Sequence, residues 1–374
     1  MADNTTIPNE LESLNDEIAR LFRRRLEILD GRASVGVDPA HERALLARVT
    51  EGLGPAAENA ARRLFATLLD IDRAHFRSAE GLDDAVLADV MAAASAPKPF
   101  ANRAMVACVG TEGAYGQKAT SLLFPFPTIF YLDRRRSVFD AVGRGLFAYG
   151  VLPVENTVSG AVAAVYDLLV RHHCHIVRTI RLKMDHVLLA LPGVKLEDVR
   201  EVTSHPHALA QCGEFLRAHA AIRTAVGTNT AVAAKELAVS GRRDAAVIAS
   251  RECAEIYGLA VLAENIADDP ANYTRFMCIG RDLEVHPDAN KFGVQFTLPH
   301  RPGSLAGFLS RFAALDINLT QLDSHPVPGT DLEYRFTLEL EASPADARVL
   351  ALLAEIAGNP EVRNFTVLGV YAAK

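Results

Sequence analysis

A short polar and aromatic segment, Asn272 to Phe276 (NYTRF), holds side chains suited to chemistry on a small organic anion. A threonine hydroxyl can donate a proton inside a pocket shielded from water, and an arginine guanidinium offers a two-pronged fork for a carboxylate. The same letters also describe the beginning of a strand whose Thr274 and Arg275 are merely solvated. The spacing alone leaves both interpretations open.

Three further segments place small polar side chains close to apolar stretches. Asn156 and Thr157 lie in VENTVSG, Ser204 and His205 lie in SHPHALAQC, and Thr230 lies in NTAVAA. Their amide, hydroxyl and imidazole groups suit a small polar ligand, but VENTVSG taken alone is more typical of a helix N-cap, and the other two segments could also be caps. Ligand binding and helix capping therefore remain alternatives for each segment by itself.

The elements that carry these residues alternate between strand and helix from Met105 onward. Apolar runs such as MVACVG (105–110), TIFYL (128–132) and YGVLPVEN (149–156) lead into polar and then helical stretches. This alternation predicts an α/β domain with largely parallel strands. Ligands of open α/β sheets bind at the carboxyl ends of the strands, and the polar segments fall there.

The two flanks of this region follow other patterns. Apolar residues recur at three- and four-residue steps from Leu11 to Leu29, so residues 9–95 are predicted to be helical, with a linker at 92–100. After residue 290, the alternating runs KFGVQFTL, INLTQLDSHP, YRFTLELEA and NFTVLGVYA, with two helical stretches between them, predict a ferredoxin-like βαββαβ unit. The chain is therefore expected to be multidomain.

Composition excludes several classes of protein. A net charge of −7 over 374 residues, without clustered Lys and Arg, argues against a nucleic-acid partner. The five cysteines contain no CxxC pair, no GxGxxG follows a strand, and no histidine pair has metal-site spacing, so no cofactor or metal is expected. Because no apolar run reaches the roughly 20 residues needed to cross a bilayer and no signal peptide is recognisable, a cytoplasmic protein without a membrane partner is expected.

In their order along the chain, VENTVSG, SHPHALAQC, NTAVAA and NYTRF, followed by PGSL and NLTQLDSHP, resemble the prephenate dehydratase family over about residues 103–374. The resemblance implies a two-lobed dehydratase domain at 103–282, similar to type II periplasmic binding proteins, with its active site between the lobes. It also implies an ACT regulatory domain at 290–374. One family hydroxyl is missing, because Gly116 stands where a serine is usual.

The activity implied by this resemblance is conversion of prephenate to phenylpyruvate, water and carbon dioxide without a cofactor. Such a reaction requires the substrate carboxylates to be held and the departing hydroxyl to be protonated. By resemblance, Thr274 is the general acid, Arg275 clamps a carboxylate and Phe276 walls the pocket. The remainder of the pocket would be lined by Asn156, Thr157, Ser204, His205 and Thr230.

Regulation by L-phenylalanine is implied by the C-terminal motifs. The effector site of the family lies at a dimer interface, so a homodimer or homotetramer is expected, and the matching residues are Gly303, Ser304, Leu305, Asn318 and Leu319. Where the family has an arginine, this chain has His325, which replaces a permanent charge by a titratable imidazole. A dimerisation module without a ligand is the alternative.

The N-terminal segment 1–95 resembles an all-helical chorismate mutase that has lost much of its site. Arg25 matches a substrate-gripping arginine and Glu42 matches an acidic residue, but Pro8 replaces a cation and the loop near residue 35 lacks the usual lysine. Catalysis by this fold needs cations directed at both carboxylates and the ether oxygen, so mutase turnover is not expected. Two rival functions remain: a bifunctional mutase and dehydratase, and a two-lobed binding module without catalysis.

Overall fold

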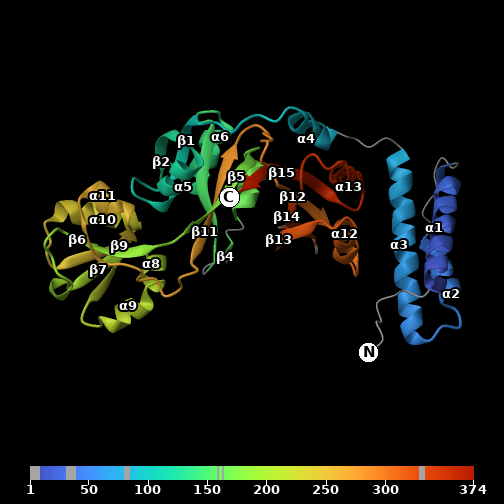
Figure 1. Ribbon diagram of the computed structural model, residues 1–374, viewed down its shortest axis with the longest axis horizontal. Helices are drawn as coiled ribbons and strands as arrows, with labels where there is room; N and C mark the ends of the chain where they lie inside the picture. Colours follow the sequence, from blue (N-terminus) through green and yellow to red (C-terminus); the bar gives the residue numbers. More distant parts are fainter. Residues whose placement is uncertain (1–8, 31–38, 80–84, 158–159, 162–163, 328–332) are drawn as a thin grey trace.

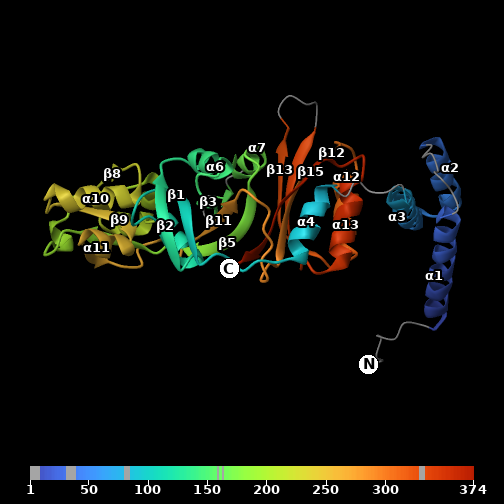
Figure 2. The same ribbon diagram turned by 90° about the horizontal axis from the view of Figure 1, so that it is seen from above.

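The computed structural model describes residues 9–30, 39–79, 85–157, 160–161, 164–327 and 333–374. Four parts follow one another along its longest axis: a second lobe, a first lobe, a C-terminal unit and an N-terminal helical hairpin (Figures 1 and 2). No helix in the described ranges is long and apolar enough to span a membrane.

The first lobe contains the strands before the chain crosses to the second lobe and the strand with which the chain returns. It contains β1 (Arg103–Val109), α5 (Tyr115–Leu123), β2 (Phe126–Leu132), α6 (Arg135–Gly143), β3 (Tyr149–Asn156), β4 (Gly160–Ala161), α7 (Ala164–Arg171), β5 (His175–Lys183) and the returning β11 (Tyr273–Gly280). Strands β1, β2 and β3 are parallel, as predicted, whereas β11 runs antiparallel between β3 and β5. The chain therefore crosses between the lobes twice, after β5 and before β11.

The second lobe has a five-stranded sheet in the order β10-β6-β9-β7-β8. Its elements are β6 (His186–Ala190), the 3₁₀ turn η1 (Leu196–Asp198), β7 (Glu201–Ser204), α8 (Pro206–Ala210), α9 (Gly213–Ala218), β8 (Arg223–Val226), α10 (Thr230–Ser240), β9 (Ala245–Ser250), α11 (Glu252–Tyr257) and β10 (Ala260–Ala263). Strand β9 is buried along its whole length. This explains its unbroken apolar sequence, because β9 lies in the centre of the sheet, antiparallel to β6 and parallel to β7, and is covered on both faces.

The C-terminal unit has the predicted βαββαβ order. It comprises β12 (Lys291–Leu298), α12 (Ser304–Ala313), β13 (Asn318–Pro326), β14 (Tyr334–Glu341), α13 (Ala347–Ala357) and β15 (Arg363–Ala373). The strands pair antiparallel in the order β13-β14-β12-β15. Helix α13 buries Val349, Leu352, Leu353 and Ile356, whose spacing of three and four residues puts them on one face.

The sheets of the first lobe and the C-terminal unit are continuous, because β15 also pairs with β5. Residues of β15 pack in two different cores: Val370 packs in the C-terminal core, while Leu368 and Tyr371 pack with the first lobe. A shared strand of this kind needs close backbone approach. At Gly369, an added Cβ would lie 2.2 Å from the carbonyl oxygen of Ile176.

We expect Gly369→Ala to lower the stability of the junction by about 1–3 kcal/mol or more, because the new methyl overlaps backbone atoms that cannot rotate away. Thermal unfolding followed by circular dichroism measures the effect. Gly54→Ala is the matched control, since nothing lies within 4 Å of its added Cβ and its backbone is not in the left-handed region. Equal unfolding midpoints for the two variants would contradict the expectation.

The N-terminal segment divides differently from its prediction as one helical unit over 1–95. Helices α1 (Asn9–Asp30), α2 (Pro39–Thr50) and α3 (Pro55–Ala79) form the hairpin, but α4 (Ala85–Ser95) packs on the C-terminal unit. Leu87 and Val90 of α4 are buried in the C-terminal core. Residues 85–95 therefore belong structurally with the C-terminal unit, since their apolar side chains are covered there.

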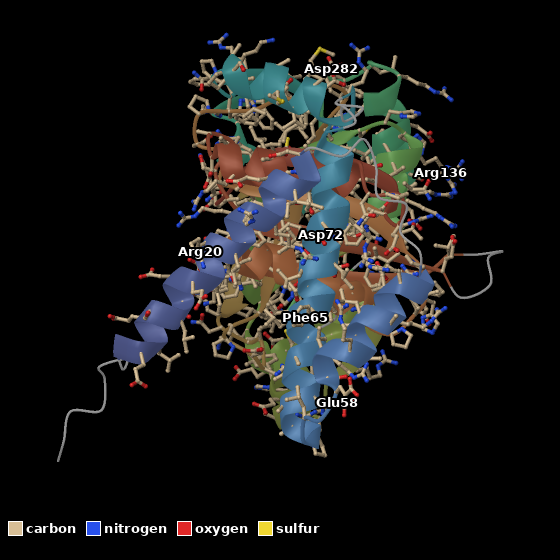
Figure 3. All side chains as sticks on the ribbon, turned by 90° about the vertical axis from the view of Figure 1, so that its right-hand side faces the viewer. Arg20, Glu58, Phe65, Asp72, Arg136 and Asp282 are labelled. Carbon is tan, nitrogen blue, oxygen red and sulfur yellow. The ribbon has the colours of Figure 1, made fainter. Side chains whose placement is uncertain are left out.

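Arg25 and Glu42, the two positions matched to a mutase site, each form an ion pair with a residue of α3. Nε of Arg25 donates to Oδ1 of Asp72 on α3 over 2.8 Å, and Glu42 accepts from Arg73, also on α3. Figure 3 shows α1 and α3 side by side, with Asp72 on α3. Asp72 thus supplies from the chain itself the anion that Arg25 would otherwise take from a ligand.

Candidate active site

The segment NYTRF forms the start of β11, where neighbouring side chains point to opposite faces of the sheet. On one face, Thr274 lies opposite Asn156 of β3. On the other face, Arg275 lies between Glu155 of β3 and Arg181 of β5. Thr274 and Arg275, although adjacent in the sequence, therefore face two different environments.

Asn156 holds the Thr274 hydroxyl in a defined orientation. Nδ2 of Asn156 donates to Oγ1 of Thr274 over 2.9 Å, to Oδ1 of Asn272 over 2.8 Å and to the carbonyl oxygen of Tyr273 over 3.1 Å. Because Thr274 accepts this hydrogen bond, its own hydrogen remains available to a ligand. Thr274 is buried, so such a hydrogen bond would form away from bulk water. Sequence reasoning brought these two residues into one pocket, and the structure places them in contact.

Asn272 ties this pair to the crossing between the lobes. Its carbonyl oxygen accepts from the backbone N–H of Met184, over 2.8 Å, just after β5 ends. The side chain is 1% exposed, and its Nδ2 has no hydrogen-bond partner among the described residues. A buried amide without an acceptor is unfavourable, which marks this end of β11 as a place where a polar ligand would be stabilised.

Thr157 holds the start of β11, and Phe276 packs farther along the same strand. Oγ1 of Thr157 donates to the carbonyl oxygen of Ala271 over 3.2 Å and accepts from the backbone N–H of Tyr273 over 3.0 Å. Phe276 lies on the same face as Thr274 and is packed in a core with Leu182 and Cys278. Thr157 therefore links the end of β3 to the start of β11, and Phe276 packs on the interior side of Thr274.

The predicted residues of the second lobe gather at the carboxyl ends of its strands. Ser204 ends β7 and is fully buried, where its Oγ donates to the carbonyl oxygen of Ile248 over 2.6 Å. His205 caps α8, with Nδ1 accepting from the backbone N–H of His207. Thr230 begins α10, whose cap is Asn229. Both segments therefore cap helices, although in SHPHALAQC the cap is His205 and not Ser204, the residue expected there. The structure records no hydrogen bond between Ser204, His205 or Thr230 and Thr274.

Burial and, second, the nearby His207 lower the pKa of His205. At neutral pH its imidazole is therefore uncharged, and toward a substrate it can offer a hydrogen bond rather than a positive charge.

A chain of three residues that sequence reasoning missed links the two lobes. The Tyr115 hydroxyl lies 3.1 Å from Nδ1 of His186, whose Nε2 lies 3.0 Å from Oε1 of Gln211. The Gln211 oxygen only accepts, so Nε2 carries the hydrogen and Nδ1 faces the tyrosine hydroxyl. Burial lowers the pKa of His186 and raises that of Tyr115, which keeps both groups neutral. Gln211 lies inside the SHPHALAQC motif, but a histidine at the start of an apolar strand gives no comparable signal.

Gly116, which stands where the family usually has a serine, is also required by packing. A Cβ at this position would lie 2.7 Å from the carbonyl oxygen of Val109 and 2.8 Å from Sγ of Cys108. The glycine therefore lets the first turn of α5 approach β1 closely.

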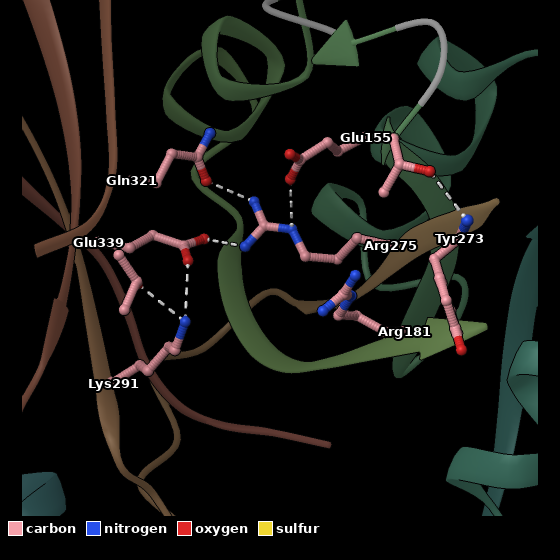
Figure 4. A pocket seen from close by; sticks show the side chains of 9 residues that line it. Glu155, Arg181, Tyr273, Arg275, Lys291, Gln321 and Glu339 are labelled. Carbon is pink, nitrogen blue, oxygen red and sulfur yellow. Dashed lines mark hydrogen bonds and ion pairs between the residues drawn. The ribbon is translucent and has the colours of Figure 1, made fainter. Parts of the chain in front are cut away.

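Arg275, predicted from the sequence to clamp a substrate carboxylate, lies on the opposite face of β11 from Thr274. Its guanidinium points toward the C-terminal unit (Figure 4), where it forms an ion pair with Glu339, and its Nε lies 3.2 Å from Oε2 of Glu155 in the first lobe. It also donates to the Tyr166 hydroxyl over 2.8 Å and to Oε1 of Gln321 over 2.6 Å. The reason is the two-residue period of a strand, which turns Arg275 away from the face that carries Thr274.

The C-terminal unit has a cavity of about 260 Å³ beside the start of α12. Ser304 and Leu305 line it together with His300, Tyr334 and Phe336. The Oγ of Ser304 is buried without a hydrogen-bond partner in the described part of the chain. Gly303 precedes α12 with a φ of 86°, a conformation that favours glycine.

Asn318 and Leu319 do not line this cavity, because they lie at the opposite end of β13 from Ser324. Nδ2 of Asn318 donates instead to Glu341 over 3.0 Å. Within one chain, the structure therefore does not bring these two residues to Ser304.

Comparison with known proteins settles the family. The family model described as prephenate dehydratase matches residues 106–284. The arogenate dehydratase 2 of Petunia hybrida is 39% identical over 287 residues, which cover 72% of each chain. This chain belongs to the prephenate dehydratase family.

Other prephenate dehydratase relatives agree with that assignment. The arogenate dehydratase/prephenate dehydratase 2 of Arabidopsis thaliana, a chloroplastic protein, is 40% identical over 257 residues, covering 66% of this chain and 67% of the relative. The enzyme is thus a lyase of the prephenate and arogenate dehydratase class.

Solved structures show the same two-lobed α/β fold. Prephenate dehydratase from Arthrobacter aurescens, solved in complex with L-Phe, aligns with a TM-score of 0.63 and 28% identity, covering 72% of this chain and 90% of that one. The structure of GqqA, described as a novel type of quorum-quenching acylase, aligns with a TM-score of 0.65 and 28% identity, covering 72% and 98%.

Proposed function

We propose that this enzyme converts prephenate to phenylpyruvate, water and carbon dioxide, with Thr274 directing its hydroxyl at the departing hydroxyl of the substrate. The observation that carries the proposal is the hydrogen bond from Asn156 to Thr274, which leaves the threonine hydrogen free to be donated. As the C–O bond breaks, the leaving hydroxide takes up a proton and departs as water. The electrons of the C–CO₂ bond pass into the ring, which becomes aromatic, and carbon dioxide is released.

The substrate pocket is proposed to lie between the lobes, at the facing carboxyl ends of their strands. Both lobes supply polar groups there: Asn156 and Thr274 come from the first, and His205 and Thr230 come from the second. Contacts across the lobes support this placement. The Ser250 hydroxyl donates to the carbonyl oxygen of Gly113 over 2.8 Å.

An acylase activity, the one given for the structural neighbour GqqA, is less well supported. Cleavage of an amide by Thr274 would need an adjacent base to activate its hydroxyl. Its recorded partner in the described part of the chain is the Asn156 amide, which donates and is not a base. The shared fold alone does not transfer the activity.

Purified protein incubated separately with prephenate, arogenate and chorismate tests the proposal. We expect phenylpyruvate to form from prephenate, and no prephenate to form from chorismate, because Arg25 and Glu42 are already paired with Asp72 and Arg73. Turnover of arogenate alone would overturn the choice of substrate. Turnover of chorismate would establish the bifunctional alternative, and binding of prephenate without turnover would establish the binding module.

The C-terminal unit is proposed to be an ACT domain that binds L-phenylalanine, in a homodimer or homotetramer. The cavity next to Ser304 supports this proposal, since Tyr334 and Phe336 offer aromatic walls and the Ser304 hydroxyl lacks a partner among the described residues. Gly303, Ser304 and Leu305 are the proposed contacts within one chain. Asn318 and Leu319 would have to come from a second chain.

We expect phenylalanine to inhibit the dehydratase and Ser304→Ala to raise the half-inhibitory concentration about threefold to tenfold. One lost neutral hydrogen bond has an effect of this size, about 0.5–1.5 kcal/mol. Ser310→Ala is the control, because the Ser310 hydroxyl is exposed and donates to the carbonyl oxygen of Gly307 in its own helix. An unchanged inhibition curve for Ser304→Ala would remove Ser304 from the effector site.

A further inference from the structure

A polar cavity of about 380 Å³ lies between the first lobe and the C-terminal unit (Figure 4). Tyr273 and Arg275 of β11 line it, so it flanks Thr274 on the opposite face of the same strand. The C-terminal unit contributes Lys291, Gln321 and Glu339. The cavity is distinct from the one beside Ser304, and Thr157 and Arg275, two residues predicted from the sequence to bind substrate, both line it.

The carboxylate of Glu339 is unusually deep for a charged group. Its side chain is 2% exposed, in the middle of β14, and it accepts from Arg275 and, over 3.4 Å, from Lys291. Burial of an unpaired carboxylate is strongly unfavourable, and the contacts with these two cations offset that cost at Glu339. Lys291 is its neighbour in the C-terminal sheet, and Arg275 comes from the first lobe.

Arg275 is contacted from both the first lobe and the C-terminal unit. Glu339 and Gln321 of the C-terminal unit face one edge of its guanidinium, while Glu155 and Tyr166 of the first lobe face the rest. Its side chain is 11% exposed. A planar guanidinium bound at several nitrogens fixes both the position and the rotation of the side chain.

We propose that Glu339 is a positioning residue for Thr274, contributed to the reaction by the C-terminal unit and acting through Arg275. The inference rests on the proposed dehydratase function. Arg275 and Thr274 are joined by one peptide bond, so the orientation of the arginine restrains the rotation of β11 at the threonine. That rotation sets whether Oγ1 of Thr274 meets Nδ2 of Asn156 and presents its hydrogen to the substrate. Small errors in such placement lower rates strongly, because the reacting groups must be aligned.

The proposal predicts a specific kinetic pattern in a double-mutant cycle of Glu339→Gln and Arg275→Gln. Glu339→Gln keeps the shape of the side chain but removes the charge that holds Arg275. We expect the kcat for prephenate to fall at least about tenfold while KM changes less than about threefold, since Glu339 does not touch the substrate. In the Arg275→Gln background, Glu339→Gln should lower kcat by no more than about twofold further, because residues acting in series are not additive.

A matched control is available in the same unit. Glu355 forms a partly buried ion pair with Arg311 over 2.8 Å, away from β11, so Glu355→Gln removes the same kind of charge and should leave kcat unchanged. Tyr166→Phe removes one acceptor of Arg275 without leaving an unpaired charge and should lower kcat in the same direction by a smaller factor. The folded fraction of each variant is measured by circular dichroism before its kinetics.

Each outcome decides the inference. A folded Glu339→Gln variant with kcat within threefold of the wild type overturns it, as do independent, multiplicative effects of Glu339→Gln and Arg275→Gln. A rise in KM at constant kcat would instead restore Arg275 to the substrate site. If Glu339→Gln does not fold, Tyr166→Phe takes its place, and unchanged kinetics for that variant overturn the inference. A wild-type protein inactive on prephenate contradicts the proposed function itself.

Discussion

Thr274→Ala lowers the kcat for prephenate by at least about a hundredfold. A positioned proton donor typically contributes a factor of 10²–10⁴, and Thr274 is the buried hydroxyl that Asn156 orients. Stability should change little, because Nδ2 of Asn156 keeps two other acceptors, Oδ1 of Asn272 and the carbonyl oxygen of Tyr273. The measurement is steady-state turnover of prephenate alongside thermal unfolding.

Two variants separate the hydroxyl from the shape of the side chain. Thr274→Ser keeps the oxygen that accepts from Asn156 and should retain activity within about tenfold of the wild type. Thr274→Val keeps the volume but removes the hydroxyl, so it should resemble the alanine variant. A Thr274→Val variant with nearly wild-type turnover would show that a water molecule, not Thr274, supplies the proton.

The strand period explains both the successful and the unsuccessful part of the sequence interpretation of NYTRF. Asn156 lies where VENTVSG ends β3, and Thr274 lies where NYTRF begins the neighbouring strand β11, so the two residues are in contact. The ordered motifs of the sequence therefore predicted this contact. Arg275 was assigned to the same pocket by resemblance to the family, whereas the period of a strand directs it to the opposite face from Thr274. Its partner Glu339 lies 64 residues away, and the alternating pattern of β14 does not mark that carboxylate as buried.

The fold was predictable where the signal is local. The βαββαβ order and the α/β alternation follow from periodicity and turns, and the structure confirms both. The burial of α4 against the C-terminal core depends on contacts between residues near 90 and residues beyond 280, which periodicity does not report. The pairing of β15 with β5 is likewise a long-range event, and its local trace is Gly369, whose missing side chain lets the two strands approach.

Asn156→Asp is expected to abolish most dehydratase activity, with a fall in kcat of about a hundredfold, although it changes the side chain by a single atom. Nδ2 of Asn156 faces three acceptors, at 2.8 Å, 2.9 Å and 3.1 Å. A carboxylate oxygen in its place cannot donate to any of them. The Thr274 hydroxyl would turn and donate its hydrogen to the new carboxylate, so the proton donor would be withdrawn from the substrate.

The same substitution should also destabilise the enzyme, by about 1–3 kcal/mol for each buried acceptor left without a donor, and this distinguishes it from Thr274→Ala. Asn290→Asp is the control for the chemical change. Oδ1 of Asn290 accepts from the backbone N–H of Ala373, a role that an aspartate oxygen retains, so activity and stability should be preserved. Kinetics on prephenate and thermal unfolding are measured for both variants. If Asn156→Asp retained wild-type turnover, the orientation of Thr274 by Asn156 would have no part in the reaction, and the hydroxyl would have to be aligned by the substrate itself.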